Sequence, residues 1–116
     1  MFINLTNHPS STWGMEQLKA TLQYGQIIDL PFPIIEPHLG TDEVNTIADE
    51  MVKRIKETDT SPVVHIMGEM TFTYAVVSRL KALGITCLAS TTERITVNTP
   101  DGKKLSEFKF VQFREY

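Results

Sequence analysis

The stretch that decides the fold is PVVHIMGEMTFTYAVVSRLKALGITCLA at positions 62–89. Pro62–Met67 is a nearly continuous apolar run, which is typical of a strand buried on both faces of a parallel sheet. Gly68 then opens a turn into a helix that ends at Gly84, and Ile85–Ala89 is a second apolar run. The inward-facing positions of that helix are expected to be Phe72, Val76, Leu80 and Leu83. A strand, a helix and a strand in this order predict a right-handed parallel crossover.

The preceding residues repeat this pattern. Phe2–Leu5 and Ile27–Leu30 are short apolar runs, separated by a segment in which Ser11 or Thr12 is expected to cap a helix. Thr41 is the expected cap of a longer amphipathic helix, whose apolar stripe is Val44, Ile47, Ala48, Met51, Val52 and Ile55. The sequence therefore predicts one α/β domain over residues 1–116, a single doubly wound, mostly parallel sheet of Rossmann-like type.

The C-terminal part predicts an antiparallel β-hairpin. Arg94–Asn98 and Phe108–Phe113 both alternate, and Thr99-Pro100-Asp101-Gly102 between them is a strong turn signal. A period of two places Phe108 and Phe110 on one face and Phe113 on the other, so one of these faces is a candidate contact with a second subunit.

The composition limits the class of protein. The chain has 116 residues, of which 41% are hydrophobic and 22% charged, as in ordinary globular domains. A net charge of −3 argues against a protein that coats long DNA or RNA. No apolar run approaches the roughly 18 residues that span a bilayer, so we expect no membrane partner. The single cysteine, Cys87, and the absence of a signal-peptide pattern favour a cytoplasmic setting.

Three polar segments follow predicted strands, at the sheet edge where α/β proteins bind ligands. The first reads NHPSSTW at positions 7–13. Asn7, Ser10 and Ser11 are candidate hydrogen-bond donors to a ligand, His8 a candidate proton shuttle, and Trp13 a candidate stacking surface. The structural alternative is that the polar residues only form turns and caps, while Trp13 packs against the helix.

The second segment reads GEMTFT at positions 68–73. Gly68 lets a ligand approach the backbone, and free N–H groups at the start of the following helix favour an anion such as phosphate. Met70, Thr71 and Thr73 are the other candidate contacts, and Glu69 would have to face away from an anion or act on protons. The alternative is an ordinary strand-to-helix turn capped by Thr71.

The third segment is Ser90-Thr91-Thr92-Glu93-Arg94. Its hydroxyls suit phosphate or ribose, and Arg94 would supply the positive charge. The alternative is a surface pair between Glu93 and Arg94, with threonines that simply suit a strand.

Other chemistries find little support. His8, His38 and His65 lie on three separate segments without the spacing of metal ligands, so we predict no metal and no other cofactor. His65 lies inside an apolar run and is interpreted as a core histidine with satisfied hydrogen bonds. Neither a G-x-S-x-G elbow, a Walker loop nor a GxGxxG dinucleotide fingerprint is present.

The motifs themselves resemble a known group. NHPSS at 7–11, VVHIMGEMTFTYAVV at 63–77, ASTTER at 89–94, DGKK at 101–104 and FKFVQFREY at 108–116 look like small CRISPR-associated proteins of type III systems. These are Rossmann-like domains related to the CARF sensors, and several are ring nucleases that cleave cyclic oligoadenylate messengers. The resemblance covers most of the chain, although each motif is short.

The resemblance implies a homodimer that holds a cyclic oligoadenylate, in particular cyclic tetra-adenylate, across two copies of the loops. Cleavage would need no metal, because the ribose 2′-OH attacks its own phosphate while the protein positions it. On this sequence His8 would be the acid or base and Arg94 the counter-charge. The hydroxyls of Ser10, Ser11 and Thr71 and the N–H groups of 68–71 would bind phosphate. A rival function is a non-catalytic sensor or sequestering protein of the same fold, and a third is a structural partner whose polar loops only cap helices.

Overall fold

A computed structural model describes residues 1–116 as a mixed α/β domain built on one five-stranded sheet. The strand order is β2-β1-β3-β4-β5, and every neighbouring pair is parallel except β4 and β5. The strands are β1 (Phe2–Thr6), β2 (Ile27–Asp29), β3 (Val63–Met67), β4 (Cys87–Asn98) and β5 (Lys104–Glu115). The expected mostly parallel sheet and C-terminal hairpin are therefore confirmed.

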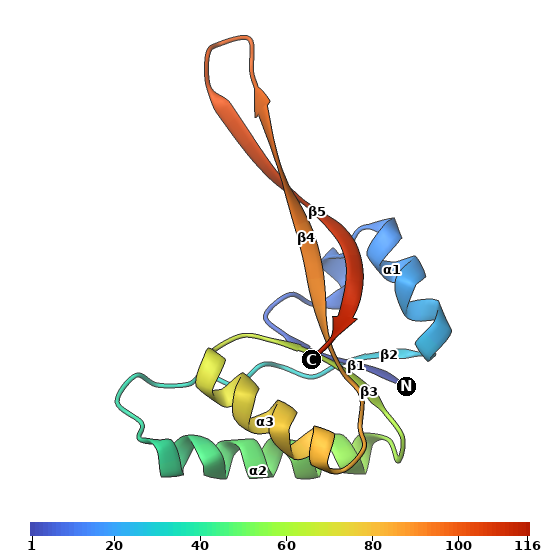
Figure 1. The fold of residues 1–116 in the computed structure, drawn as a ribbon, viewed down its shortest axis with the longest axis vertical. Coiled ribbons are helices and arrows are strands. Elements are labelled where there is room, and N and C mark those ends of the chain that lie inside the picture. The colour runs from blue at the N-terminus through green and yellow to red at the C-terminus, as the bar shows by residue number, and fades with distance from the viewer.

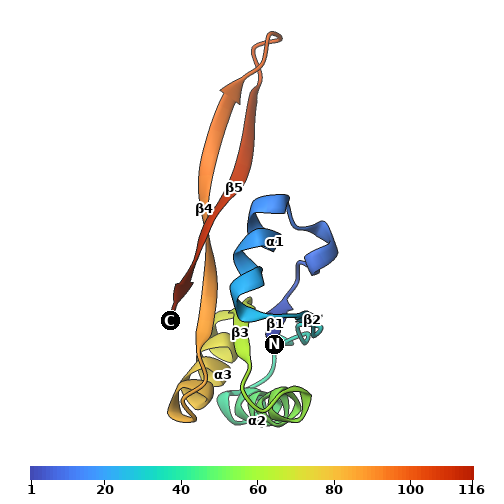
Figure 2. The same ribbon diagram turned by 90° about the vertical axis from the view of Figure 1, so that its right-hand side faces the viewer.

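Helices cover the sheet from both sides. Figures 1 and 2 show α1 (Met15–Thr21) on one side of β1 and β3, and α2 (Thr41–Thr58) and α3 (Met70–Ala82) together on the other. Two single 3-10 turns, η1 (Ser10–Thr12) and η2 (Leu22–Tyr24), flank α1. The chain thus leaves β1 toward one face of the sheet and leaves β3 toward the other.

The hydrophobic core lies between the sheet and the pair α2 and α3. β1 is buried along its whole length, and the central residues of β3 are buried as well, which fits strands covered on both faces. α2 contributes its predicted stripe, in which Ile47 is partly buried, and α3 contributes Phe72, Val76 and Leu80. The expected inward position of Leu83 is wrong, because α3 ends at Ala82 and Leu83 is 52% exposed. The fully buried members of this core are Ile3, Leu5, Ala48, Ile55, Val64, Ile66, Phe72, Val76 and Leu80.

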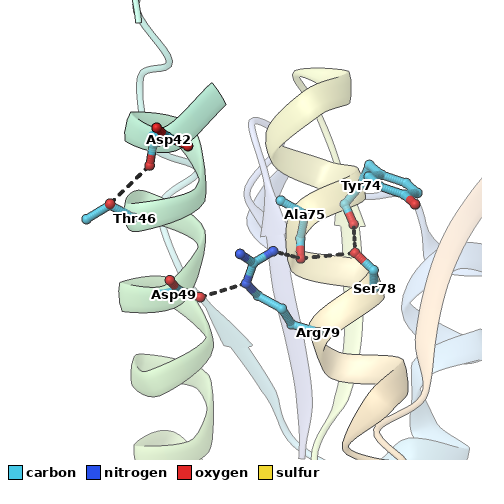
Figure 3. A network of polar contacts seen from close by, with 7 residues as sticks. All are labelled: Asp42, Thr46, Asp49, Tyr74, Ala75, Ser78 and Arg79. Carbon is cyan, nitrogen blue, oxygen red and sulfur yellow. Dashed lines mark hydrogen bonds and ion pairs between the residues drawn. The ribbon is translucent and has the colours of Figure 1, made fainter. Parts of the chain in front are cut away.

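Polar contacts join α2 to α3 on the outer surface of this pair (Figure 3). Arg79 on α3 donates from Nε to Asp49 Oδ1 on α2 at 2.6 Å, and from Nη1 to the carbonyl of Ala75 at 2.9 Å. Thr46 and Ser78 bond backward to carbonyls of their own helices. Because the carboxylate of Asp49 is two-thirds exposed, we expect this ion pair to stabilise the fold by less than about 1 kcal/mol.

Several predicted helix starts are wrong by one to three residues. α1 begins at Met15 behind Gly14, because Ser10–Thr12 first forms a separate 3-10 turn, so neither Ser11 nor Thr12 caps it. α2 begins with Thr41 as its first helical residue, and Gly40 occupies the cap position. Neither cap makes a side-chain hydrogen bond, which explains why cap chemistry could not locate these starts.

The hairpin formed by β4 and β5 extends far beyond the other three strands of the sheet. The polar segment 90–94 does not follow a strand but lies within one, because β4 continues without a break from Cys87 to Asn98 and pairs with β5, so the alternative in which its threonines suit a strand is confirmed. The outer half of the two strands projects from the body as an arm (Figures 1 and 2). The molecule measures 51 × 38 × 21 Å and has a radius of gyration of 16.2 Å, against roughly 13 Å for a compact domain of this size. The turn at the tip lies where the sequence placed it, with Gly102 at φ +82°.

A bulge in β5 corrects the predicted facing of the aromatic residues. Thr91 pairs with Gln112 but Thr92 pairs with Phe110, so Val111 is an extra residue in β5. One extra residue reverses the alternation beyond it, which places Phe110 and Phe113 on the same face with ring centroids 5.0 Å apart. The expectation that Phe113 faces away from Phe108 and Phe110 is therefore wrong.

None of the helices combines the length and the apolar character that crossing a lipid bilayer requires.

Candidate functional site

A cavity of about 880 Å³ opens at the carboxyl ends of β1 and β3, on the α1 side of the sheet. This is the point at which the two strands send the chain to opposite faces, where open α/β sheets characteristically bind ligands. The volume lies in the range of roughly 300–1,000 Å³ found for small-molecule sites. Its lining consists of residues 6–8 and 12–17, His65, Met67 and Gly68 at the end of β3, and Ser90, Thr92 and 108–110 of the hairpin.

Asn4 organises the base of this cavity. Its side chain is 1% exposed, and Nδ2 donates to Asp29 Oδ1 at 2.8 Å and to the carbonyl of His8 at 2.9 Å. Its Oδ1 accepts from the hydroxyl of Thr6 at 3.0 Å and lies 3.0 Å from Nδ1 of His65. One buried amide therefore ties β1 to β2, to β3 and to the loop that follows β1.

Ser10 fastens the same loop to the end of β2. Its backbone N–H and its hydroxyl both donate to the carboxylate of Asp29, at 3.1 and 2.8 Å. Partial burial works to raise the pKa of Asp29, but the hydrogen bonds from Asn4 and Ser10 outweigh it and lower the pKa. Both hydrogen-bond donors of Ser10 are thus engaged by the carboxylate of Asp29. Ser10 lies outside the cavity lining, as does Ser11.

Trp13 and His8 form one wall. The indole N–H of Trp13 donates to the carbonyl of His8 at 3.1 Å, which fixes the ring against the loop. The Trp13 ring meets Phe2 and His65 edge-on, with centroids 6.1 and 5.5 Å away. The backbone of His8 is held by Thr6, whereas its imidazole is exposed and lines the cavity. His8 is therefore the exposed histidine of the cavity lining.

His65 lies at the floor of the cavity and is only partly satisfied. The side chain is 2% exposed, and its Nδ1 contacts Asn4. Its Nε2 is buried without a hydrogen-bond partner in the protein, so the expectation of a satisfied core histidine is wrong for this nitrogen. Burial lowers the pKa of His65 to about 4, which keeps the ring neutral.

The cap of α3 engages part of the helix start that the second predicted segment was expected to offer to an anion. Glu69 is the N-cap of α3, and its own carboxylate accepts from the N–H groups of Thr71 and Phe72 at 3.1 and 2.8 Å. The hydroxyl of Thr71 also donates to Glu69. The hydrogen bond from Phe72, followed by that from Thr71, lowers the pKa of Glu69. Of the N–H groups at 68–71 that were expected to bind phosphate, that of Thr71 is therefore engaged by a side chain of the protein. The alternative in which Thr71 caps the helix is wrong, because the cap is Glu69.

Gly68 has a packing reason for lacking a side chain. A Cβ at this position would lie 2.2 Å from Cζ of Phe32, whose ring contacts Phe72 edge-on. Gly68 touches the main cavity, but Met70 and Thr73 belong to a second depression of about 320 Å³ on the α3 side, together with Tyr74 and Tyr116.

The third segment divides between the two faces of β4. Ser90 and Thr92 line the cavity, and the hydroxyl of Ser90 also lies 3.1 Å from the sulfur of Met67. Thr91 faces the other way and donates to the carbonyl of Gln112. Arg94 shares the face of Thr92 but lies further out along the arm, where it donates to Ser106 at 3.2 Å.

The structure thus brings together only part of the predicted site. The predicted residues that line the cavity are Asn7, His8, Trp13, Gly68, Ser90 and Thr92. Those outside its lining are Ser10, Ser11, Glu69, Met70, Thr71, Thr73, Thr91 and Arg94. The sequence did not predict that His65 and Phe110 line the cavity. The only signal for His65 was its polar side chain in an otherwise apolar strand. No three His, Cys, Asp or Glu side chains gather as a metal site would require.

Fold and cavity together define an α/β protein with a ligand-sized cavity at the switch point of its parallel sheet. The chain belongs to the uncharacterized protein MJ1673 family, whose profile matches residues 1–114. Neither a curated protein nor a solved structure matches the chain. The description of the family assigns no activity, so the function is inferred from the cavity.

Proposed function

We propose that this protein binds a cyclic oligoadenylate in the cavity at the ends of β1 and β3 and cleaves it as a ring nuclease. The observation that carries the proposal is the juxtaposition of Trp13, His8 and the buried acceptor His65 around one cavity of about 880 Å³. A flat base suits the aromatic floor, and an exposed imidazole at the wall suits proton transfer at a ribose or phosphate. The motif resemblance to small Rossmann-like CRISPR-associated proteins supports the same ligand.

Phosphate groups would lie at the rim of the cavity. The floor is aromatic and holds a neutral imidazole, which favours a base over an anion. Lys109 of β5 is the one Lys or Arg in the cavity lining, and Arg94 lies outward of Thr92 on the same face of the hairpin. A cyclic tetra-adenylate has two-fold symmetry, so two copies of this cavity in a homodimer would share one ring.

In the proposed reaction the 2′-OH of one ribose attacks the adjacent phosphorus, and the 5′-oxygen leaves. A 2′,3′-cyclic phosphate and a free 5′-hydroxyl result. His8 makes one of the two proton transfers, from the 2′-OH or to the leaving 5′-oxygen, and a water molecule makes the other, so that the protons balance. The protein otherwise positions the ribose for in-line attack. The reaction consumes no water and needs no metal ion.

A second function, binding without cleavage, is favoured by one observation. Of the three residues expected to act in catalysis, only His8 lines the cavity, whereas Ser11 and Arg94 do not. A protein with this site would hold the messenger and either sense it or lower its free concentration.

Incubation of the purified protein with labelled cyclic tetra-adenylate in EDTA separates the two functions. Linear products that disappear with His8→Ala, but persist with His38→Ala, support the ring nuclease; His38 is an exposed histidine outside the cavity lining. Binding without products supports the sensor. Absence of both products and binding contradicts both functions.

A further inference from the structure

The proton on His65 is assigned by its neighbour Asn4. Nδ2 of Asn4 donates to the carboxylate of Asp29 and to the carbonyl of His8, and both of these groups are acceptors only. The amide orientation is thereby fixed, and Oδ1 is the atom that meets Nδ1 of His65 at 3.0 Å. Because Oδ1 can only accept, Nδ1 carries the hydrogen, and Nε2 of the neutral ring presents a lone pair.

This lone pair lies in aromatic surroundings. The His65 ring stacks on Phe2 with centroids 5.9 Å apart, and meets Trp13 and Phe113 edge-on at 5.5 and 5.2 Å. His65 is 98% buried, lines the cavity and has no protein donor for Nε2. Buried polar atoms in native proteins almost always have a partner. Because the ring that carries this unpaired acceptor lines the cavity, the missing partner is expected to be a donor on the ligand, which reaches Nε2 once a small movement of the surrounding rings uncovers it.

We propose that His65 determines specificity, with Nε2 accepting a hydrogen bond from an N–H of the bound base. This inference rests on the proposed function, in which that donor is the 6-amino group of adenine. Hypoxanthine carries a carbonyl oxygen in place of the 6-amino group. This oxygen and Nε2 of His65 are both acceptors, so a ring that contains hypoxanthine is expected to bind less tightly. A phosphate oxygen is excluded for the same reason. Asn4 and Asp29 act as positioning residues, because they hold the imidazole in the tautomer that accepts.

The test compares two rings that differ at this edge of the base: adenine has a 6-amino group and a bare N1, whereas hypoxanthine has a 6-carbonyl oxygen and a hydrogen on N1. Cyclic tetra-adenylate and cyclic tetra-inosinate are prepared with 2′-fluoro riboses, which removes both the nucleophile for cleavage and the 2′-hydroxyl as a rival donor. Calorimetry on the wild-type protein is expected to show that the adenylate ring binds at least about tenfold more tightly, because the wrong base leaves a buried acceptor unpaired. His65→Phe retains the aromatic ring, and its discrimination is expected to fall to within about threefold.

His38→Phe is the matched control and is expected to retain the wild-type preference. Equal affinity of the wild-type protein for both rings overturns the role of His65 while leaving the proposed function intact. Failure of both 2′-fluoro rings and of native cyclic tetra-adenylate to bind overturns the proposed function and this inference together. Binding of native rings of both bases, abolished by 2′-fluoro substitution, identifies a ribose hydroxyl as the donor and overturns the adenine assignment.

An NMR measurement on the wild-type protein tests the inference in the case that His65→Phe does not fold. Long-range ¹H–¹⁵N spectra of the wild-type protein are expected to show His65 as the neutral Nδ1–H tautomer. Its ¹⁵Nε2 resonance is expected to shift when the adenylate ring binds and to shift less with the inosinate ring. An Nε2–H tautomer in the free protein, or an ¹⁵Nε2 resonance unmoved by the adenylate ring, overturns the inference.

Discussion

Replacement of Asn4 by alanine should cost the protein about 3 kcal/mol of unfolding free energy, and the structure shows which partner causes the loss. Asp29 is exposed and regains water, while the hydroxyl of Thr6 keeps a second contact, with the carbonyl of His8, at 3.1 Å. His65 has no such substitute, because Asn4 is its only polar partner. A neutral imidazole carries one N–H, and in either tautomer that N–H would then be buried and unpaired.

The magnitude follows from two contributions. An unsatisfied buried donor costs about 1–3 kcal/mol, and the lost hydrogen bonds of the amide itself add roughly 1 kcal/mol net. A total of about 3 kcal/mol is a large share of the 5–15 kcal/mol by which domains are typically stable. Urea unfolding followed by the fluorescence of Trp13 measures it, provided that the slope against urea is unchanged.

Asn45→Ala is the matched control, because Asn45 lies half-buried on α2 without a side-chain hydrogen bond. That substitution should change the unfolding free energy by less than about 0.5 kcal/mol, and toward greater stability, since alanine favours helix. A loss below about 1 kcal/mol for Asn4→Ala would refute the role assigned to the buried amide.

Three further perturbations test other parts of the structure. Glu69→Ala should cost about 1 kcal/mol at neutral pH because α3 loses its cap. Since the folded-state pKa of Glu69 is lowered, this contribution is fully present above the ordinary pKa of 4.5 and is lost as the pH falls through the lower value, so denaturation curves of variant and wild type should converge in acid. Gly68→Ala should cost about 1–3 kcal/mol through collision with Phe32, and a double-mutant cycle with Phe32→Leu should recover part of it. Replacing residues 95–107 by Asn-Gly should leave the thermal midpoint within a few degrees and lower the radius of gyration from 16.2 Å toward about 14 Å in small-angle scattering.

A specific result would contradict each of these three predictions. A stability difference for Glu69→Ala that persists unchanged into acid would mean that its carboxylate does not cap the helix. Strict additivity in the cycle would mean that Phe32 is not what forbids a side chain at position 68. Loss of cooperative unfolding on shortening the arm would show that the arm belongs to the core.

The sequence predicted the architecture because the architecture depends on hydrophobic patterning. Buried parallel strands are continuous apolar runs, and the stripe of α2 has helical spacing, so both were visible without any structure. Helix starts were less predictable, since the caps at Gly14 and Gly40 have no side chain to bond. The strand β4 was cut short because Ser90–Arg94 is polar, although polar residues are expected in a hairpin that leaves the body.

The site was only half predictable for a related reason. Strand ends identified the correct edge of the sheet and hence His8 and Trp13, which do line the cavity. Which polar groups remain free depends on contacts between distant segments: Ser10 is occupied by Asp29, nineteen residues away, and Glu69 occupies its own helix start. The free nitrogen of His65 depends on Asn4, sixty-one residues away.

The extra residue Val111 gives β5 one position that the pairing of the arm does not use. Thr91 and Thr92 pair with Gln112 and Phe110 on either side of it, and β4 continues without a break, so β4 sets the register of the arm. Deletion of Val111 would therefore close the bulge and leave Phe110 opposite Thr92, on the face that lines the cavity. Deletion of a paired residue further out, such as Lys109, would instead turn Phe108 to the opposite face. Length variation is therefore expected to be tolerated at the bulge and at the tip around Gly102, and to be excluded in the paired part of β5 between them.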